Sequence, residues 1–259
     1  MEYFDSHCHL NDEAILSNIE EEYRLCLEAG VTHMLCVGYD VASSKVAVDL
    51  AERFPAVYAA VGVHPENLEP DMNKALQEIK ELAKHPKVLA IGEIGLDYYW
   101  YKDPEIRNAQ KPWFIAQIAL AEELGLPISI HARDAVADTL EILKEHTPAH
   151  GGVLHCYSGS PESLKEFAKL GLYFGFDGPI TFKNAVTPKE CVRVCPLDRL
   201  LVETDSPYLA PTPFRGKQNS PKYIPFIVDE MAKIKEMEPA KLNEALWENF
   251  SRLFRVKHG

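Results

Sequence analysis

The sequence lacks an apolar run of the roughly 18 residues that a membrane-spanning helix needs, so we expect no membrane span. Its first residues, MEYFDSHCH, contain neither a basic segment nor an apolar one, so we expect no secretory signal. Positive charge is also scarce: 27 Lys and Arg stand against 39 Asp and Glu, a net charge of −12. This balance excludes a broad nucleic-acid-binding face, but it permits a nucleic-acid substrate gripped at one end.

The chain also lacks any Cys-x-x-Cys pair. Its six cysteines are scattered through apolar segments, a pattern that favours buried free thiols in a reducing cytoplasm over a disulfide framework or a zinc knuckle. These residues are Cys8, Cys26, Cys36, Cys156, Cys191 and Cys195.

Short apolar runs alternate with longer amphipathic stretches along all 259 residues. The strand-like runs are Tyr3–His9, Val31–Val37, Val57–Val63, Val88–Ile94, Ile128–His131, Val153–His155, Leu172–Phe176 and Leu200–Glu203. The helical stretches are Glu13–Ala29, Val41–Phe54, Met72–Lys84, Pro104–Leu124, Ala135–Glu145 and Glu162–Leu170, with terminal helices from Ile224 onward. The alternation predicts one α/β domain, residues 1–259, folded as a (β/α)8 TIM-like barrel, with a doubly wound open sheet as the competing architecture.

Residues with metal-ligand side chains follow five of these apolar runs. His7 and His9 share one face of a strand because side chains alternate, whereas Cys8 points the other way. A barrel would gather the strand ends at its C-terminal rim, whereas an open sheet would not. The set is His7, His9, Glu93, His131, His155 and Asp205.

Four imidazoles and two carboxylates suit a pair of divalent cations. Glu93 is the expected bridge, because a carboxylate offers one oxygen to each of two cations. His7, His9 and Asp205 would complete one site, and His131 and His155 the other. A structural metal is the alternative, but such sites are usually rich in sulfur. Asp205 has a second candidate role, as the acceptor of a proton from a metal-activated water.

Several residues near the predicted rim are candidates for holding substrate. His64, before Pro65, would orient or neutralise a substrate oxygen, or would only cap its own loop. Arg133 follows His131, and Arg215 and Lys217 lie in the loop after Asp205, where cations suit phosphate recognition. Solvated surface is the alternative for that basic loop.

Aromatic residues also follow the predicted ligands. Tyr157 lies two residues after His155, and the run Tyr98–Tyr101 comes soon after Glu93. Such rings would stack on a base or sugar, or would only pack. Tyr157 is the stacking candidate because it lies close to a ligand.

The motifs DSHCHL, VGVHP, IGEIGLDYYW, HARDA, LHCYSG, LVETDSPYLAP and RGK resemble those of the TatD-type metal-dependent deoxyribonucleases of the amidohydrolase superfamily. The resemblance runs in order from Asp5 to about Pro221. It implies a TIM-like barrel that binds two divalent cations (Mg²⁺, Mn²⁺ or Zn²⁺) and hydrolyses phosphodiesters in DNA. The family's ligands carry over onto the same six residues, with Glu93 in the bridging position.

Two positions depart from the family pattern. Many members have a histidine where this chain has Glu66, and many carry a more basic loop than RGKQNSP, in which Gln218 and Ser220 are neutral. Both departures remove possible cationic contacts to phosphate and leave the metal ligands intact.

Our primary hypothesis is a cytoplasmic two-metal 3′–5′ DNA exonuclease, in which a metal-activated hydroxide attacks phosphorus. Catalysis falls to Asp205, Glu93 and His64, with Arg133, Arg215 and Lys217 holding phosphate. The expected substrates are DNA ends or short single strands, with no membrane and no obligate protein partner. One alternative is an ester or amide hydrolase, such as a D-aminoacyl-tRNA deacylase, which would make tRNA a partner. Another is a metal-binding protein without turnover.

Overall fold

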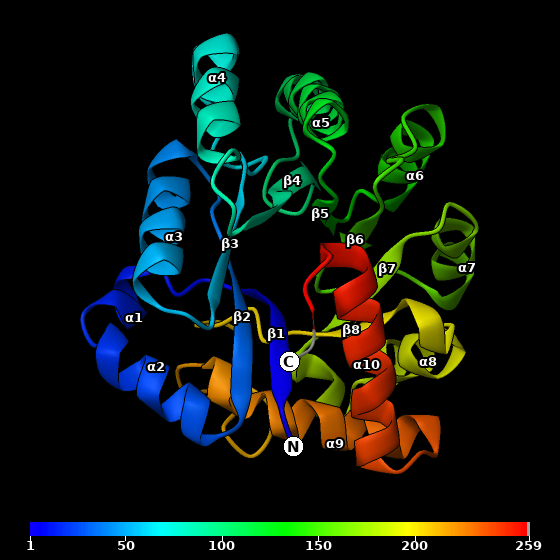
Figure 1. Cartoon of the computed structure of the whole chain (residues 1–259). Coiled ribbons are helices and arrows are strands. Elements are labelled where there is room, and N and C mark those ends of the chain that lie inside the picture. Colours follow the sequence, from blue (N-terminus) through cyan, green and yellow to red (C-terminus); the bar gives the residue numbers. More distant parts are fainter. Residues whose placement is uncertain (258–259) are drawn as a thin grey trace.

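Eight parallel strands form one sheet, ordered as in the chain, in the computed structural model, which describes residues 1–257 (Figure 1). The strands are β1 (Tyr3–Cys8), β2 (Val31–Val37), β3 (Val57–Val61), β4 (Val88–Asp97), β5 (Ile128–Arg133), β6 (Gly152–Leu154), β7 (Tyr173–Phe176) and β8 (Leu200–Val202). All eight predicted strands are present, and β4 extends three residues beyond its predicted end because Gly95, Leu96 and Asp97 pair with β5. The predicted (β/α)8 barrel is confirmed.

The two edges of the sheet meet where β1 ends and β8 is followed by its loop. The Asp205 N–H donates to the His7 carbonyl at 2.9 Å, and the His9 N–H donates to the Ser206 carbonyl at 2.8 Å. Within the strands themselves, the Ser6 hydroxyl of β1 donates to the Val202 carbonyl of β8 at 2.9 Å. These bonds connect the first strand, β1, with β8 and the loop that follows it. The barrel is therefore closed, and the competing open-sheet prediction is wrong.

The helices surround the strands in chain order (Figure 1). They are α1 (Glu13–Leu16), α2 (Ile19–Glu28), α3 (Val41–Arg53), α4 (Met72–Leu82), α5 (Pro104–Leu124), α6 (Val136–Glu145), α7 (Pro161–Lys169), α8 (Val186–Val194), α9 (Ile224–Lys235) and α10 (Pro239–Phe254). Acidic residues or a serine begin several of them; the Asp103 carboxylate, for example, accepts the Glu105 N–H at 2.8 Å at the start of α5.

One predicted helix is divided in the structure. The stretch expected as Glu13–Ala29 forms α1 and α2, because the chain turns at Ser17 and Asn18. Asp12 caps α1 through the Ala14 N–H, whereas Asn18 begins α2 without a side-chain cap. The helix α8 was not predicted, since its sequence contains few apolar residues at helical spacing.

An aromatic cluster fills the end of the barrel where the strands begin. Phe4 of β1 stacks on Phe250 of α10, with ring centroids 4.3 Å apart, and the Trp247 indole N–H donates to the Glu2 carbonyl at 2.8 Å. Helix α10 therefore closes the N-terminal end of the barrel. This packing leaves the opposite rim as the open face of the strands.

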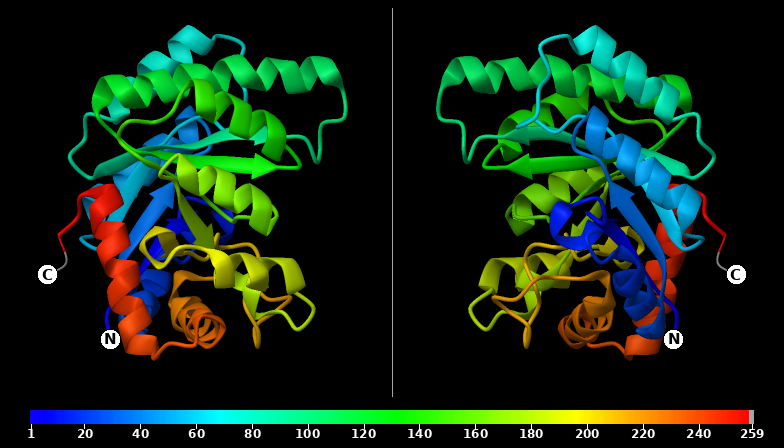
Figure 2. Two further views of the ribbon diagram at one scale, coloured as in Figure 1. Left: turned by 90° about the vertical axis from the view of Figure 1, so that its right-hand side faces the viewer. Right: turned by 90° about the vertical axis from the view of Figure 1, so that its left-hand side faces the viewer.

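Both ends of the described chain lie beside α10. Met1 and Lys257 line the same cavity, of about 930 Å³, together with Trp247. Figure 2 shows the strand arrows pointing away from this end of the molecule. In residues 1–257, the longest helices are either too short or too polar to cross a membrane.

Candidate metal centre

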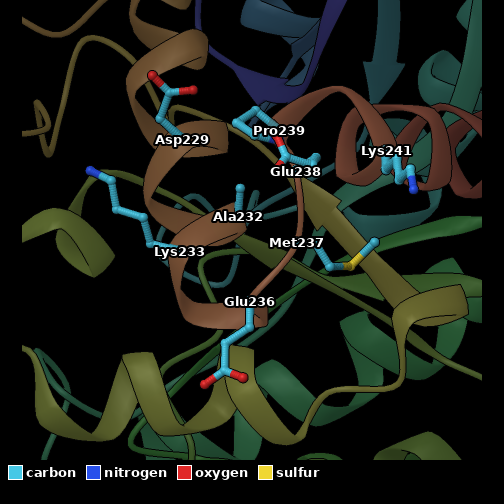
Figure 3. Close-up of a pocket in the computed structure, with 8 residues that line it drawn as sticks. All are labelled: Asp229, Ala232, Lys233, Glu236, Met237, Glu238, Pro239 and Lys241. Atoms are coloured by element: carbon cyan, nitrogen blue, oxygen red, sulfur yellow. The ribbon is translucent and has the colours of Figure 1, made fainter.

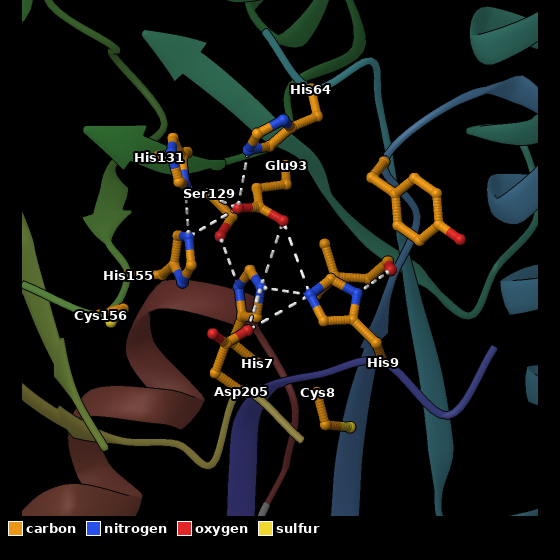
Figure 4. Close-up of polar contacts among 12 residues, drawn as sticks. His7, Cys8, His9, His64, Glu93, Ser129, His131, His155, Cys156 and Asp205 are labelled. Carbon is orange, nitrogen blue, oxygen red and sulfur yellow. Dashed lines mark hydrogen bonds and ion pairs between the residues drawn. The ribbon is translucent and has the colours of Figure 1, made fainter. Parts of the chain in front are cut away.

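Two regions differ sharply in the side chains that they gather. A groove of about 700 Å³ between α9 and α10 is lined by residues of both charge signs, among them Asp229, Lys233 and Lys241 (Figure 3). Its lining, within the described chain, contains no histidine or cysteine. At the C-terminal rim, by contrast, the predicted ligands from five strand ends converge (Figure 4). The rim is therefore the candidate site.

The pair on β1 enters this site as the strand pattern predicts. His7 is fully buried, His9 is 4% exposed, and their Nε2 atoms lie 3.3 Å apart. Cys8 points the other way, with its Sγ 3.4 Å from the Leu35 carbonyl of β2. The two imidazoles thus present one nitrogen each to the same point.

Glu93, in the middle of β4, lies at the centre of the cluster (Figure 4). Its Oε2 is 3.6 Å from the Nε2 atoms of both His7 and His9. Its Oε1 is 2.9 Å from His131 Nδ1 and 2.7 Å from His155 Nε2. Each carboxylate oxygen therefore faces a separate pair of histidines, the arrangement that a bridging ligand requires.

Asp205 adds a carboxylate to one of these pairs only. Its Oδ1 lies 3.3 Å from His9 Nε2 and 3.7 Å from His7 Nε2. Asp205 has a left-handed backbone, with φ 54°, and its N–H donates to the His7 carbonyl of β1. The predicted division of the ligands into two groups thus matches the positions of these side chains.

The charges in the cluster support one another. Burial alone would raise the pKa of Glu93, but His155, His64 and His131 hold it well below its usual range. Burial would also raise the pKa of Asp205, and its contact with His9 lowers it instead. Both carboxylates are therefore ionised at neutral pH, as ligands for a divalent cation must be.

The rear nitrogens of two of the ligand histidines bond to oxygen acceptors. His131 Nε2 lies 2.8 Å from Asp97 Oδ2, and His9 Nδ1 lies 2.9 Å from the Val37 carbonyl. When the front nitrogen binds a cation, the rear nitrogen that faces such an acceptor holds the proton of the neutral ring.

The other two histidines follow the same pattern at longer range. His155 Nδ1 is 3.6 Å from Glu203 Oε1, and His7 Nδ1 is 3.4 Å from Ser129 Oγ. These partners and Asp97 were not predicted from the sequence. The two acids lie inside the quoted motifs, in GLDYYW and LVETD, which is the signal that would have found them.

In His64 the proton lies on the ring nitrogen that faces the site. Its Nδ1 accepts the Glu66 N–H at 3.1 Å, so the proton of the neutral ring lies on Nε2, which is 3.4 Å from Glu93 Oε1. Burial lowers the pKa of His64 and keeps the ring neutral. The loop contact named in the sequence alternatives is present, and it leaves the Nε2 proton facing the site.

The three predicted cations lie outside this cluster. Arg133 is exposed and stacks 3.9 Å from the centre of the Tyr99 ring, with Trp100 at 5.6 Å. Arg215 stacks 4.3 Å from the centre of the Phe182 ring, and Lys217 is exposed in the same loop. The structure thus places one cation beside His131 on β5 and two in the loop after β8.

Tyr157 is 6% exposed, and its ring packs against Phe174 with centroids 5.1 Å apart. Its hydroxyl bonds to the Ser163 hydroxyl at 2.6 Å, at the start of α7. These contacts favour the packing alternative over a role in stacking on substrate. Tyr99 and Trp100, at 43% and 62% exposed, are the aromatic rings open to solvent on this side of Glu93.

The donor set fits divalent cations. Lone pairs of four imidazoles and two ionised carboxylates face one another in a buried cluster, and the ion pairs of these carboxylates in residues 1–257 involve histidine rather than Lys or Arg. A divalent cation that binds here would take the place of the ring protons in these contacts, because a metal ligand must give up its proton. Imidazole and carboxylate ligands suit Zn²⁺, Mn²⁺ and Mg²⁺.

Comparison with known proteins agrees with this chemistry. The family model described as TatD related DNase matches residues 4–255. The chain is 45% identical over 254 residues to YabD of Bacillus subtilis (strain 168), an uncharacterized metal-dependent hydrolase, covering 98% of this chain and 99% of that protein. It is 38% identical over 256 residues to YcfH of Escherichia coli (strain K12), which bears the same description, covering 97% and 95%.

Solved structures resemble the whole chain. YJJV, a TatD homologue from Escherichia coli K12, superimposes with a TM-score of 0.92 at 28% identity and covers 98% of both chains. A TatD-family hydrolase from Entamoeba histolytica gives a TM-score of 0.84 at 21% identity, covering 98% of both chains, which shows a shared fold.

Proposed function

We propose that this chain, which belongs to the TatD related DNase family, removes nucleotides from the 3′ ends of DNA. Like its relatives, it is a metal-dependent hydrolase. The observation that carries the proposal is the position of Glu93, whose two oxygens face two separate groups of ligand-type side chains. Centres that hold two cations in this way are typical of phosphodiester hydrolysis.

His7, His9, Asp205 and Glu93 would hold one cation, and His131, His155 and Glu93 the other. Bound divalent cations would polarise the phosphoryl oxygens and lower the pKa of water. The residues themselves then have three tasks: to orient the phosphate, to accept a proton and to keep the ligands aligned.

The Asp205 carboxylate is the proposed proton acceptor, since it is ionised and stands beside the ligand pair on β1. His64 is the proposed donor to a phosphoryl oxygen, through the Nε2 proton that its loop contact fixes. A neutral donor aimed in advance at developing negative charge stabilises the transition state.

Cations at the C-terminal rim would hold the phosphates next to the scissile bond. Arg133 projects beside His131, and Arg215 and Lys217 lie in the loop after Asp205. Three cations on a chain of net charge −12 suit a grip on the last few nucleotides of a single strand. The six cysteines, all unpaired thiols, suit a cytoplasmic enzyme.

A second candidate function is hydrolysis of a carboxylic ester or amide, such as a D-aminoacyl-tRNA. It is favoured by the acidic side chains Asp97, Glu203 and Glu66 around the centre, because the three predicted cations lie outside the cluster. A carbonyl substrate needs fewer cationic contacts than a phosphate does.

The test uses metal-stripped protein that is resupplied separately with Mg²⁺, Mn²⁺ and Zn²⁺. We expect metal-dependent release of mononucleotides from a 3′-labelled single-stranded oligonucleotide, and no release by the folded Glu93→Gln/Asp205→Asn double variant. An oligonucleotide that stays intact under every cation, while D-aminoacyl-tRNA is deacylated, would replace this proposal with the second one.

A further inference from the structure

A second group of ligand-type side chains lies beside the centre, on the side of β6, β7 and β8. It comprises Cys156, Asp177 and Asp205, whose ligand atoms all lie within 4.8 Å of one another. Figure 4 shows Cys156 next to His155, on the same side of the site as Asp205. Only Asp205 belongs to the centre described above; Cys156 and Asp177 have no task in the proposed reaction.

Asp177 is the observation that points to a ligand. The residue is 4% exposed, and its Oδ2 has no hydrogen-bond partner. Within residues 1–257 no Lys or Arg forms an ion pair with it. A buried carboxylate oxygen without a partner costs free energy unless something binds it.

The groups around Asp177 are mostly acidic, which adds to its need for a positively charged partner. Two acids, the fully buried Glu203 and Asp205, lie close enough to act on Asp177. Glu203 is already engaged, because it accepts the Cys156 N–H and lies 3.6 Å from His155. The other groups that act on Asp177 are the Cys156 thiol and His155.

The backbone aims the group inward. Cys156 and Asp205 are both non-glycine residues with a left-handed backbone, at φ 43° and φ 54°. Such conformations are unfavourable for these residue types and persist where the surrounding structure enforces them. Here they turn a thiol and a carboxylate toward Asp177, which follows β7 directly.

We propose that Cys156, Asp177 and Asp205 form a third divalent-cation site, adjacent to the two-metal centre and sharing Asp205 with it. Its sulfur ligand gives it a preference that the centre lacks: one thiolate with two carboxylates selects Zn²⁺ and similar thiophilic cations over Mg²⁺. Binding releases the thiol proton as the cation takes its place. The site would add a positive charge on a side of the rim that is otherwise acidic.

The site is tested with Co²⁺, which reports sulfur coordination through a thiolate-to-cobalt charge-transfer band in the near ultraviolet. We expect the apo-protein, titrated with Co²⁺, to develop this band and to bind one equivalent more than either Cys156→Ser or Asp177→Asn. The band should be absent from Cys156→Ser. Cys26→Ser is the matched control, since Cys26 is a buried thiol in α2, and it should keep both the band and the equivalent.

Failure of this site is separable from failure of the proposed nuclease activity, because neither the spectrum nor the stoichiometry depends on turnover. A parent protein that is saturated with Co²⁺ and shows no thiolate band would overturn the site, whatever the variants do. So would an Asp177→Asn variant that keeps the full band and the full stoichiometry. In either case a proton on Asp177, held against the Cys156 thiol, is what neutralises the group.

Discussion

The two ends of the barrel each hold partly or fully buried histidines, and they use them in different ways. At the end where the strands begin, His33 of β2 stacks on Tyr58 with centroids 5.5 Å apart and meets the edge of Trp247 at 4.9 Å. At the rim, His131 and His155 lie 2.9 and 2.7 Å from one carboxylate oxygen. Burial is therefore no guide to a ligand histidine; the neighbours of its two nitrogens are.

The rim contains a second contrast of the same kind. His131 gives its rear proton to Asp97 and keeps a lone pair for the centre, whereas His64 accepts a backbone N–H and turns its proton to the centre. The two rings are 4.3 Å apart at their centroids. One is arranged as a ligand and the other as a donor, although both face Glu93.

The largest effect is expected when the central carboxylate loses its charge. In Glu93→Gln the amide cannot bridge two cations, and we expect kcat to fall roughly a thousand-fold, about 4 kcal/mol of transition-state stabilisation. Oligonucleotide turnover and bound metal measured on the same sample test this. A variant with normal turnover and normal metal content would show that the two halves of the rim do not depend on Glu93.

A smaller effect is expected from Asp97→Asn. Asp97 Oδ1 accepts the Tyr99 and Trp100 N–H groups, so an amide would keep its oxygen there and point its NH₂ at His131. His131 would then hold its proton on the nitrogen that faces Glu93. We expect metal affinity to fall by about ten- to a hundredfold, as measured by competition with a chelator.

Unchanged affinity in Asp97→Asn would mean that the tautomer of His131 is set elsewhere. Asp97→Glu serves as the matched variant, since it keeps the charge but moves it.

Removing the donor at His64 should act on turnover alone. We expect His64→Leu to lose about tenfold in kcat, near 1.4 kcal/mol, while keeping its full metal content. His64→Gln, which retains a side-chain N–H, should recover part of the loss. Metal loss in His64→Leu equal to that in a ligand variant would remove the distinction between His64 and the four ligand histidines.

The smallest effect is expected at the opposite end. We expect His33→Phe to leave turnover within about twofold and the free energy of unfolding within about 1 kcal/mol, because the ring already packs among aromatic neighbours. Thermal unfolding and oligonucleotide turnover test this together. A large loss of turnover at normal stability would mean that the two ends of the barrel are coupled.

The sequence alone was enough to predict the strands and to select the candidate ligands that they bring together. His7 and His9 alternate with Cys8 along β1, and Glu93 lies in an apolar strand where a carboxylate is conspicuous. Such patterns are local, so they can be recognised without knowing how the strands pair.

What escaped prediction depends on contacts across strands. Asp97 contacts His131 on β5, and Glu203 lies near His155, which follows β6. Neither contact can be predicted until the pairing register of the strands is known. Asp177 follows a strand, as His9, His155 and Asp205 do, but no histidine stands near it in the sequence. Tyr157 follows a ligand closely in the sequence, yet its ring turns into the wall of the barrel.

The two ends of the described chain, Met1 and Lys257, lie beside α10, far from the C-terminal rim of the strands, which makes this end of the barrel a suitable place for attachment. An affinity tag, a fluorescent reporter or a surface tether fused at Met1 would extend from the floor of the barrel, where Met1 and Lys257 share a cavity. Protein immobilised in this way would keep the C-terminal rim of the barrel facing the solution.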